Sequence, residues 1–155
     1  MACTCEDALS ALSAHLGLPL RFDDGTCSLR LGDQPFTLRQ EDEPDRLVLT
    51  ALVADDLPDP PGRKLVCDLL DLGFGLLQGG LPAVARDPET GFIAAFAQFP
   101  CATLVASEFP DAFDKFAAFA TSLSDRLDTE RAGGAAPPPP PESFPPPGSD
   151  SFIPV

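Results

Sequence analysis

Residues 83–99 read AVARDPETGFIAAFAQF, which is two apolar runs on either side of a turn. The turn, 87–91, contains proline and ends in glycine, the residue that most readily adopts the positive φ a tight turn needs. The runs therefore predict an antiparallel hairpin, with strands at 83–86 and 92–99. In the second strand Phe92, Ala94 and Phe96 alternate with Ile93, Ala95, Ala97 and Phe99. Since an antiparallel strand normally leaves one face in water, two apolar faces suggest that a partner covers one of them.

The segment before this hairpin, 63–78, predicts a helix whose apolar positions cover more than half of its circumference. Only Asp68, Asp71 and Gln78 form a weak polar side. A helix of this kind needs burial on two sides, against its own sheet and against something else. Ordinary intramolecular core is the alternative interpretation of this apolar surface, and it applies equally to the first helix and the strands that follow it.

Upstream, the pattern changes from helical to alternating. Thr4 can cap a first helix that ends at Gly17. A hairpin turn at 23–26 then joins Leu20 and Phe22 to the next strand. Alternation predicts three strands, at 27–31, 36–39 and about 46–54, with an acidic loop at 41–45.

Downstream, a third helix begins at Ser107 and Glu108 and ends near Arg131, and 102–105 can supply a further short strand. The order is α-β-β-β-α-β-β-α, which predicts an α+β fold with helices packed on a twisted antiparallel sheet. Residues 132–155 hold nine of the 19 prolines and little apolar periodicity. We therefore expect one folded domain, 1–131, and a disordered Pro-rich tail, 132–155.

The charge excludes several classes of partner. With 24 acidic and 10 basic residues, the formal charge is −14. This opposes binding to nucleic acid, whose phosphates need lysine and arginine, and to an anionic membrane surface. No apolar run is long enough to span a bilayer, and no basic segment followed by an apolar one suggests a secretory signal. We expect a cytoplasmic protein.

Candidate catalytic groups are few. The five cysteines, an odd number, are Cys3, Cys5, Cys27, Cys67 and Cys101. Only Cys3 and Cys5 form a close pair, and no second pair completes a zinc site, so reduced structural thiols are favoured over metal binding or a redox role. His15, the one histidine, accompanies no nucleophile motif. We expect neither an enzyme nor a cofactor nor a metal; an enzyme with an unrecognised site is the alternative, which a bound metabolite would support.

Several short motifs, in this order and spacing, resemble class I type III secretion chaperones, the Tir-chaperone family. They are LPLRF at 18–22, DGTCSL at 24–29, LLDL at 69–72, GG at 79–80, DPETGFI at 87–93, FP at 99–100 and TL at 103–104. The resemblance covers about residues 5–128. Two features depart from the family pattern, which often has asparagine near the glycine break where this chain has Gly73, Gly75 and Gln78, and which lacks the long tail.

The resemblance implies a cytoplasmic homodimer of a Gram-negative bacterium. Such a dimer binds the N-terminal segment of a secreted effector as an extended chain, keeps it soluble and secretion-competent without ATP, and can deliver it to the export ATPase. An adaptor on the same scaffold that sequesters a transcriptional regulator of secretion is the alternative. The dimer interface would use Leu69, Leu72, Leu76, Phe92 and Phe96. The effector grooves would use Leu9, Leu12, Leu16, Phe22, Leu29, Leu31 and Phe36, some of which must be core instead.

Overall fold

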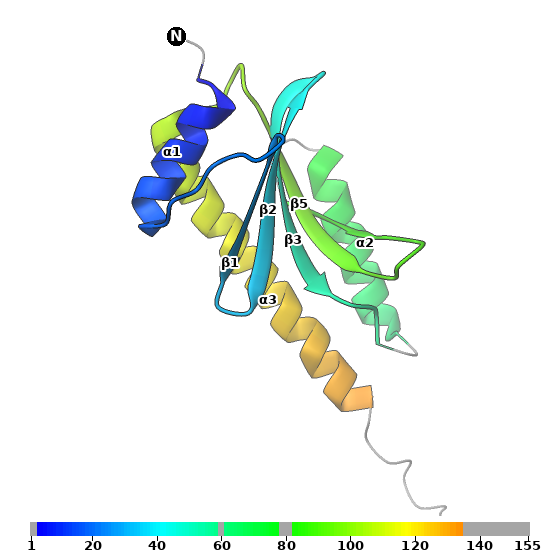
Figure 1. Ribbon diagram of the computed structural model, residues 1–155. Helices are drawn as coiled ribbons and strands as arrows, with labels where there is room; N and C mark the ends of the chain where they lie inside the picture. The colour runs from blue at the N-terminus through cyan, green and yellow to red at the C-terminus, as the bar shows by residue number, and fades with distance from the viewer. Residues whose placement is uncertain (1–2, 59–60, 78–81, 135–155) are drawn as a thin grey trace, which may run out of the picture.

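A five-stranded antiparallel sheet organises the protein. The computed structural model describes residues 3–58, 61–77 and 82–134. Its elements are α1 (Cys5–Leu16), β1 (Thr26–Leu31), β2 (Gln34–Asp42), β3 (Asp45–Ala54), α2 (Arg63–Leu77), β4 (Ala83–Arg86), β5 (Ile93–Pro100), the 3₁₀ turn η1 (Ala106–Glu108) and α3 (Phe109–Gly134). The strand order is β1-β2-β3-β5-β4 (Figure 1). The predicted fold class and element order are confirmed.

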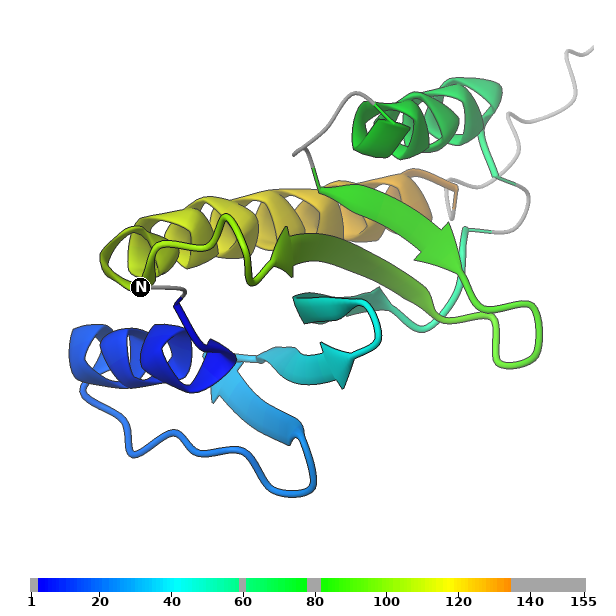
Figure 2. The same ribbon diagram turned by 90° about the horizontal axis from the view of Figure 1, so that it is seen from above.

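Helices α1 and α3 cover one face of the sheet and lie side by side (Figures 1 and 2). The inward side chains of α3 meet those of the central strands. Phe36 of β2, which is fully buried, packs against Phe113 and Phe116 with ring centroids 5.4 and 6.3 Å apart. Every second residue of β3 and β5 joins the same core, as strand alternation requires.

The first helix begins and ends as its sequence indicates. Thr4 Oγ1 accepts a hydrogen bond from the Asp7 backbone N–H at 3.1 Å, while the Asp7 carboxylate accepts one from the Thr4 N–H at 2.9 Å. This reciprocal capping box satisfies N–H groups that the first turn leaves free. Gly17 ends the helix with φ of 66°, a left-handed conformation that favours glycine.

Helix α2 has a different position, because it lies beside β4 at the edge of the sheet (Figures 1 and 2). Leu65 is its one buried anchor among the side chains described there. Asp68 ties α2 to α3 through Arg126 and also accepts a hydrogen bond from Lys64 at 2.7 Å. Of the apolar side chains of α2 that the structure describes, Leu70 is exposed, and Val66, Leu69 and Leu72 are only partly buried.

Some local expectations are wrong. The hairpin proposed for 20–26 is reduced to one isolated bridge, Asp23 to Thr26. The predicted acidic loop at 41–45 belongs mostly to strands, because β2 and β3 pair as far as Asp42 and Asp45, and ion pairs offset the charge of Glu41.

Two boundaries also differ from the expected ones. Residues 102–105 form a turn and coil rather than a strand. Helix α3 follows η1 and continues to Gly134, three residues beyond its expected end. The glycine break at 79–80 and tail residues 135–155 lie outside the described part of the chain.

Candidate binding surfaces

The most apolar hollow lies between α2 and β4 and has a volume of about 180 Å³. We call it the α2–β4 groove. It is lined by Leu57, Val66, Leu69, Leu70, Val84, Ala85, Arg86 and Ile93. Leu70 is 70% exposed, the largest exposure among the large hydrophobic residues of the described chain. Leu70 adjoins the other apolar side chains of the groove, and contiguous exposed apolar surface is typical of a surface that another protein covers.

Helical spacing explains why α2 leaves this surface exposed. Leu65, Leu69 and Leu72 follow one another at intervals of four and three, so they share the face that packs toward the sheet. Leu65 is buried, whereas Leu69 is partly buried against the core. Val66 and Leu70, four residues apart, form the adjacent face and line the groove.

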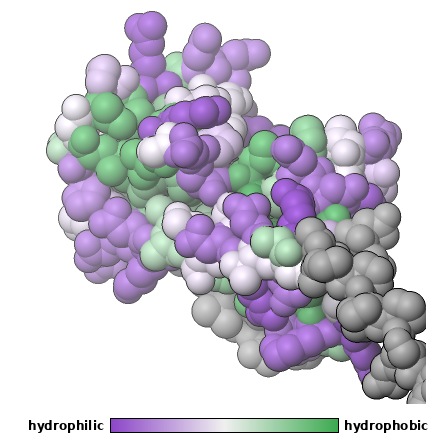
Figure 3. All heavy atoms as spheres, turned by 90° about the horizontal axis from the view of Figure 1, so that it is seen from below, coloured by the Kyte–Doolittle hydropathy of each residue, from purple (hydrophilic) through white to green (hydrophobic). Residues whose placement is uncertain are grey.

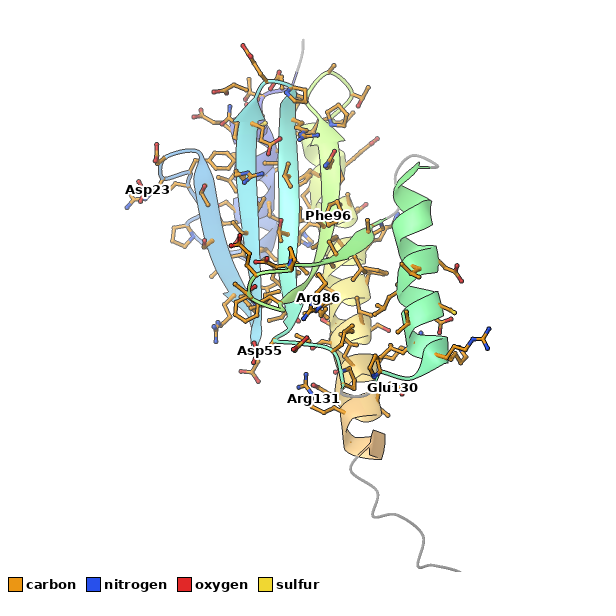
Figure 4. The ribbon with its side chains drawn as sticks, turned by 90° about the vertical axis from the view of Figure 1, so that its right-hand side faces the viewer. Asp23, Asp55, Arg86, Phe96, Glu130 and Arg131 are labelled. Carbon is orange, nitrogen blue, oxygen red and sulfur yellow. The ribbon has the colours of Figure 1, made fainter. Side chains whose placement is uncertain are left out.

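Charged groups close one end of the α2–β4 groove. The Asp56 carboxylate accepts hydrogen bonds from the Leu57 backbone N–H at 2.8 Å and from the Arg86 guanidinium at 3.3 Å. Both bonds lower the pKa of Asp56. Arg131 of α3 donates to the Asp56 carbonyl at 2.9 Å, so the end of α3 is tied to this rim (Figure 4).

A second hollow of about 500 Å³ lies on the sheet face that α1 and α3 do not cover. The β4–β5 hairpin curls over this face (Figure 4). Its lining includes Thr50, Leu52, Phe92 and Ala94. The Asp87 carboxylate accepts hydrogen bonds from the backbone N–H of Glu89 and from the hydroxyl of Thr90. These bonds lower the pKa of Asp87 and hold the hairpin turn in place.

The five residues predicted for a dimer interface do not share one hollow. Leu69 lines the α2–β4 groove, and Leu72 is half-buried on the same helix. Phe92, 42% exposed, and half-buried Phe96 belong to the uncovered sheet face. Leu76 lies in α2, but its side chain is outside the described residues.

Sequence reasoning missed Val66 and Leu70 in this region. A signal for them was present, because their i, i+4 spacing marks a second apolar stripe next to the stripe of Leu65 and Leu69. The stripe chosen from the sequence is the one that the chain itself partly buries.

The seven residues predicted for effector grooves divide into two sets. Four are core side chains of this chain, with at most 9% exposure: Leu9, Leu12, Leu29 and Phe36. Buried against α3 and the sheet, they offer almost no surface to a peptide. Three remain partly exposed and pack at the edge of the core: Leu16, Phe22 and Leu31.

Two further hollows flank the extended segment 19–23, which connects α1 to β1. One, about 290 Å³, lies between α1 and this segment and is lined by Glu6, Leu9, Ser10, Ser13, Leu20, Arg21 and Phe22. The other, about 390 Å³, lies between the segment and β1 and includes Pro19, Leu20, Thr26 and Ser28. We call the two together the N-terminal groove. In Figure 3 apolar residues gather on the left, the side on which α1 lies in Figure 1.

Strand β1 is an edge of the sheet, and part of its outer side is free. Thr26 uses its outward N–H and C=O on Asp23, at 3.0 and 2.8 Å. Strand alternation turns the backbone groups of Ser28 and Arg30 the same way. Neither residue has an outward hydrogen-bond partner among the described residues. A free edge of this kind can pair with another extended chain.

Catalytic groups do not converge on these surfaces. His15 forms an exposed contact with Asp114 at 2.9 Å, which links α1 to α3. Within the described part of the chain, one cluster could supply metal ligands: Cys5, Asp45 and Cys101, which lie at the end of the sheet where α1 begins. The same described residues include no helix long and apolar enough to cross a membrane.

Comparison with protein families and solved structures gives a consistent result. The model of the Tir chaperone protein (CesT) family matches residues 7–124. A search of curated proteins finds no match. The chain is similar to a chain of the ExsC–ExsE complex, with 23% identity and a TM-score of 0.62, over 77% of this chain and 90% of that one.

Two further solved structures share the fold. The HopA1–SchA chaperone–effector complex matches with 24% identity and a TM-score of 0.57, over 82% of this chain and 92% of that one. The ExoT–SpcS complex from Pseudomonas aeruginosa matches with 17% identity and a TM-score of 0.52, over 78% and 94%. At these identities the likeness establishes a shared fold.

Proposed function

The chain belongs to the Tir chaperone protein (CesT) family, and from this premise we propose that it is a type III secretion chaperone. In this role it binds the N-terminal segment of a secreted effector as an extended chain and keeps it secretion-competent. The role needs binding alone and no ATP. One of the solved structures with this fold is itself a chaperone–effector complex, which supports the proposal.

The free edge of β1 beside the N-terminal groove is the observation that carries the proposal. An extended peptide binds a sheet edge through its backbone, and alternate side chains enter neighbouring pockets. The outward groups of Ser28 and Arg30 supply the first of these requirements. Partly exposed Leu16, Phe22 and Leu31 supply apolar contacts next to this edge.

A second copy of the chain is the proposed partner of the α2–β4 groove. Leu70 is exposed in this groove, and Phe92 is exposed on the adjoining sheet face. In a monomer both side chains are in contact with water. Burying both, together with Leu69, Leu72 and Phe96, removes apolar area from water and favours association. This arrangement leaves the β1 edge, at the opposite side of the sheet, available for effector.

Charge complementarity favours a basic effector segment. The whole chain has a formal charge of −14. Glu6 and Asp23 line the N-terminal groove beside Arg21. Opposite charge accelerates encounter and improves specificity more than it raises affinity, so we expect binding to slow as salt rises.

Phe22→Asp tests the effector site. The probe is the N-terminal segment of a candidate effector, co-expressed with the chain and purified by size-exclusion chromatography with light scattering. We expect the variant to lose co-elution at least about tenfold while it remains a dimer, because a charge replaces an apolar contact in the groove. Val105→Asp, a matched change at an exposed site outside the N-terminal groove, should co-elute like the wild type.

Two results would contradict the assignment. Loss of the dimer in Phe22→Asp would place this residue on the other surface. Capture of a transcriptional regulator in place of an exported effector would favour the adaptor role on the same scaffold.

A further inference from the structure

Two buried thiols from distant parts of the sequence touch each other. The Sγ atoms of Cys5 and Cys101 are 2.8 Å apart, although the residues are 96 positions apart in the sequence. Their exposed fractions are 1% and 3%. Neither the proposed chaperone role nor the binding surfaces use this pair.

Regular structure holds both cysteines in place. Cys5 is the first residue of α1, directly after the Thr4 cap. Cys101 follows the last residue of β5, and its backbone N–H donates to the Asp45 carbonyl at 3.2 Å. Both side chains belong to the main core cluster. Their contact is therefore set by the packing of α1 against the end of the sheet.

We propose that Cys5 and Cys101 are a modification site, an oxidisable pair that closes to a disulfide joining α1 to the end of β5. In a disulfide the sulfur atoms are about 2.0 Å apart. The pair is already in sulfur–sulfur contact, so closure needs a small approach of two atoms that face each other. Among the described residues, the three other cysteines have no such sulfur contact. Cys3 is partly exposed, with its Sγ 3.3 Å from the Thr4 carbonyl oxygen, Cys27 is buried, and Cys67 is exposed on α2.

The reaction is exchange with a low-molecular-weight disulfide, for which glutathione disulfide is the probe. One cysteine thiolate attacks a glutathione sulfur, forms a mixed disulfide and releases one glutathione thiolate. The second cysteine thiolate then attacks the bonded protein sulfur and releases the other. In total two protein S–H bonds and one glutathione S–S bond break, one protein S–S bond forms, and two electrons and two protons end on two glutathione molecules.

The surroundings make this exchange slow. Burial raises the pKa of Cys5, and burial together with its contacts to Cys5 and Asp45 raises the pKa of Cys101. Because the thiolate is the nucleophile, the pair reacts when the first turn of α1 opens and admits the oxidant. Once formed, the bond lies in the core, where a reductant also reaches it slowly.

Closure would fix one wall of the N-terminal groove. Helix α1 forms that wall through Glu6, Ser10 and Ser13. A cross-link between α1 and the segment after β5 also restricts the unfolded chain, by an amount that grows slowly with the length of the loop it closes. The effect on the groove rests on the proposed function, whereas the bond itself does not.

The first experiment maps the bond directly in the full chain. The reduced protein is incubated with glutathione disulfide under native conditions, alkylated, digested and examined by mass spectrometry. We expect a cross-linked peptide containing Cys5 and Cys101, separate from any mixed disulfide between glutathione and the exposed thiol of Cys67. Cys67→Ala should give the same cross-linked peptide, because the thiol of Cys67 is exposed on α2 and takes no part in the proposed bond.

Thermal unfolding provides an independent readout. The oxidised protein should melt about 5 to 15 °C above the reduced protein. This difference should vanish in Cys5→Ala and Cys101→Ala and persist in Cys27→Ala, which also removes a buried thiol. Comparing each variant with itself, oxidised and reduced, separates the bond from any general loss of stability.

Three outcomes would overturn the proposal. The first is the absence of a peptide cross-linked between Cys5 and Cys101 after prolonged oxidation of the folded chain. The second is a cross-link that joins other cysteines. The third is one equivalent of zinc in the purified protein that protects Cys5 and Cys101 until a chelator is added, which would make Cys5, Asp45 and Cys101 a metal site instead. None of these outcomes bears on effector binding, so the chaperone proposal stands or falls separately.

Discussion

Helices α1 and α2 carry the same kind of leucine-rich pattern but lie in different surroundings. Leu9 and Leu12 of α1 are buried, with exposed fractions of 3% and 0%. Leu70 of α2 is 70% exposed. Helix α1 packs against α3 and η1, whereas α2 has β4 as its main neighbour.

The two helices differ in what covers their apolar stripes. An apolar stripe indicates that one face of a helix is buried, but the tertiary fold determines which surface covers that face. For α1 the covering surface is the chain's own core. For α2 the chain supplies only part of the cover, and the proposed second copy supplies the rest.

Truncation in α1 should give the largest effect. Leu12→Ala removes a fully buried side chain and leaves a cavity, so we expect a loss of about 2 to 5 kcal/mol in the free energy of unfolding. Urea unfolding followed by circular dichroism measures it. Leu16→Ala, on the same helix but partly exposed, should lose clearly less. Equal losses would mean that α1 is not covered as the structure has it.

A charge on α2 should affect association instead of folding. Leu70→Asp places a carboxylate in the α2–β4 groove, and burial of a leucine is worth about 1.5 to 3 kcal/mol. We expect the dimer Kd to rise about 10- to 100-fold, measured by sedimentation equilibrium. Denaturant unfolding of the monomeric form should be nearly unchanged. The matched change Val105→Asp should leave association intact; a dimer unaffected by Leu70→Asp would exclude this groove from the interface.

Removing the α1 cap tests the ordered helix end. Thr4→Ala deletes the hydroxyl that accepts the Asp7 N–H, so we expect a loss of about 1 kcal/mol. Hydrogen exchange should increase in the first turn of α1 before it increases elsewhere. Thr129→Ala, where the hydroxyl donates to a carbonyl within α3, is the matched control. Identical protection of the first turn in Thr4→Ala would show that the cap contributes nothing.

Acid should weaken the link between α2 and α3. Hydrogen bonds from Lys64 and Arg126 hold the pKa of Asp68 below its usual value. Its ionised form therefore stabilises the fold above the ordinary carboxyl pKa of about 3.9, and this contribution is lost as the pH falls through the lowered folded-state value. Because the group is solvent-accessible, the effect is small.

Urea titrations between pH 2 and 5 measure this contribution. Asp68→Asn should flatten the fall in stability across this window, whereas Asp71→Asn, exposed on the same helix, should follow the wild type. A wild-type acid profile in Asp68→Asn would contradict the role of this link between α2 and α3.

Much of the fold could be predicted because local signals agreed. The change from helical spacing to alternation located α1 and the strands β1 to β3, and the turn at 87–91 located the second hairpin. Thr4 and Gly17 marked both ends of α1. The predictions failed where the local sequence did not favour one structure, as at 41–45. There the acidic residues belong mostly to paired strands, and Arg39 and Arg46 form ion pairs with Glu41.

The binding surfaces were less predictable. Leu12, Leu16 and Leu70 look alike in the sequence, yet one is core, one lies at a groove edge and one is exposed. The free backbone groups of β1 could not be inferred either, since they depend on which strand ends at the edge of the sheet.

Local sequence patterns specify the element order, the alternation of each strand and the caps of α1, and the composition gives the strongly negative charge. Each of these depends on residues a few positions apart, whose geometry the backbone fixes. Only the tertiary structure decided that Cys5 meets Cys101, that Phe36 packs on Phe113, and that Leu70 is left uncovered. These contacts join segments far apart in the chain, and no local pattern specifies which distant surface a helix or strand will meet when the core closes.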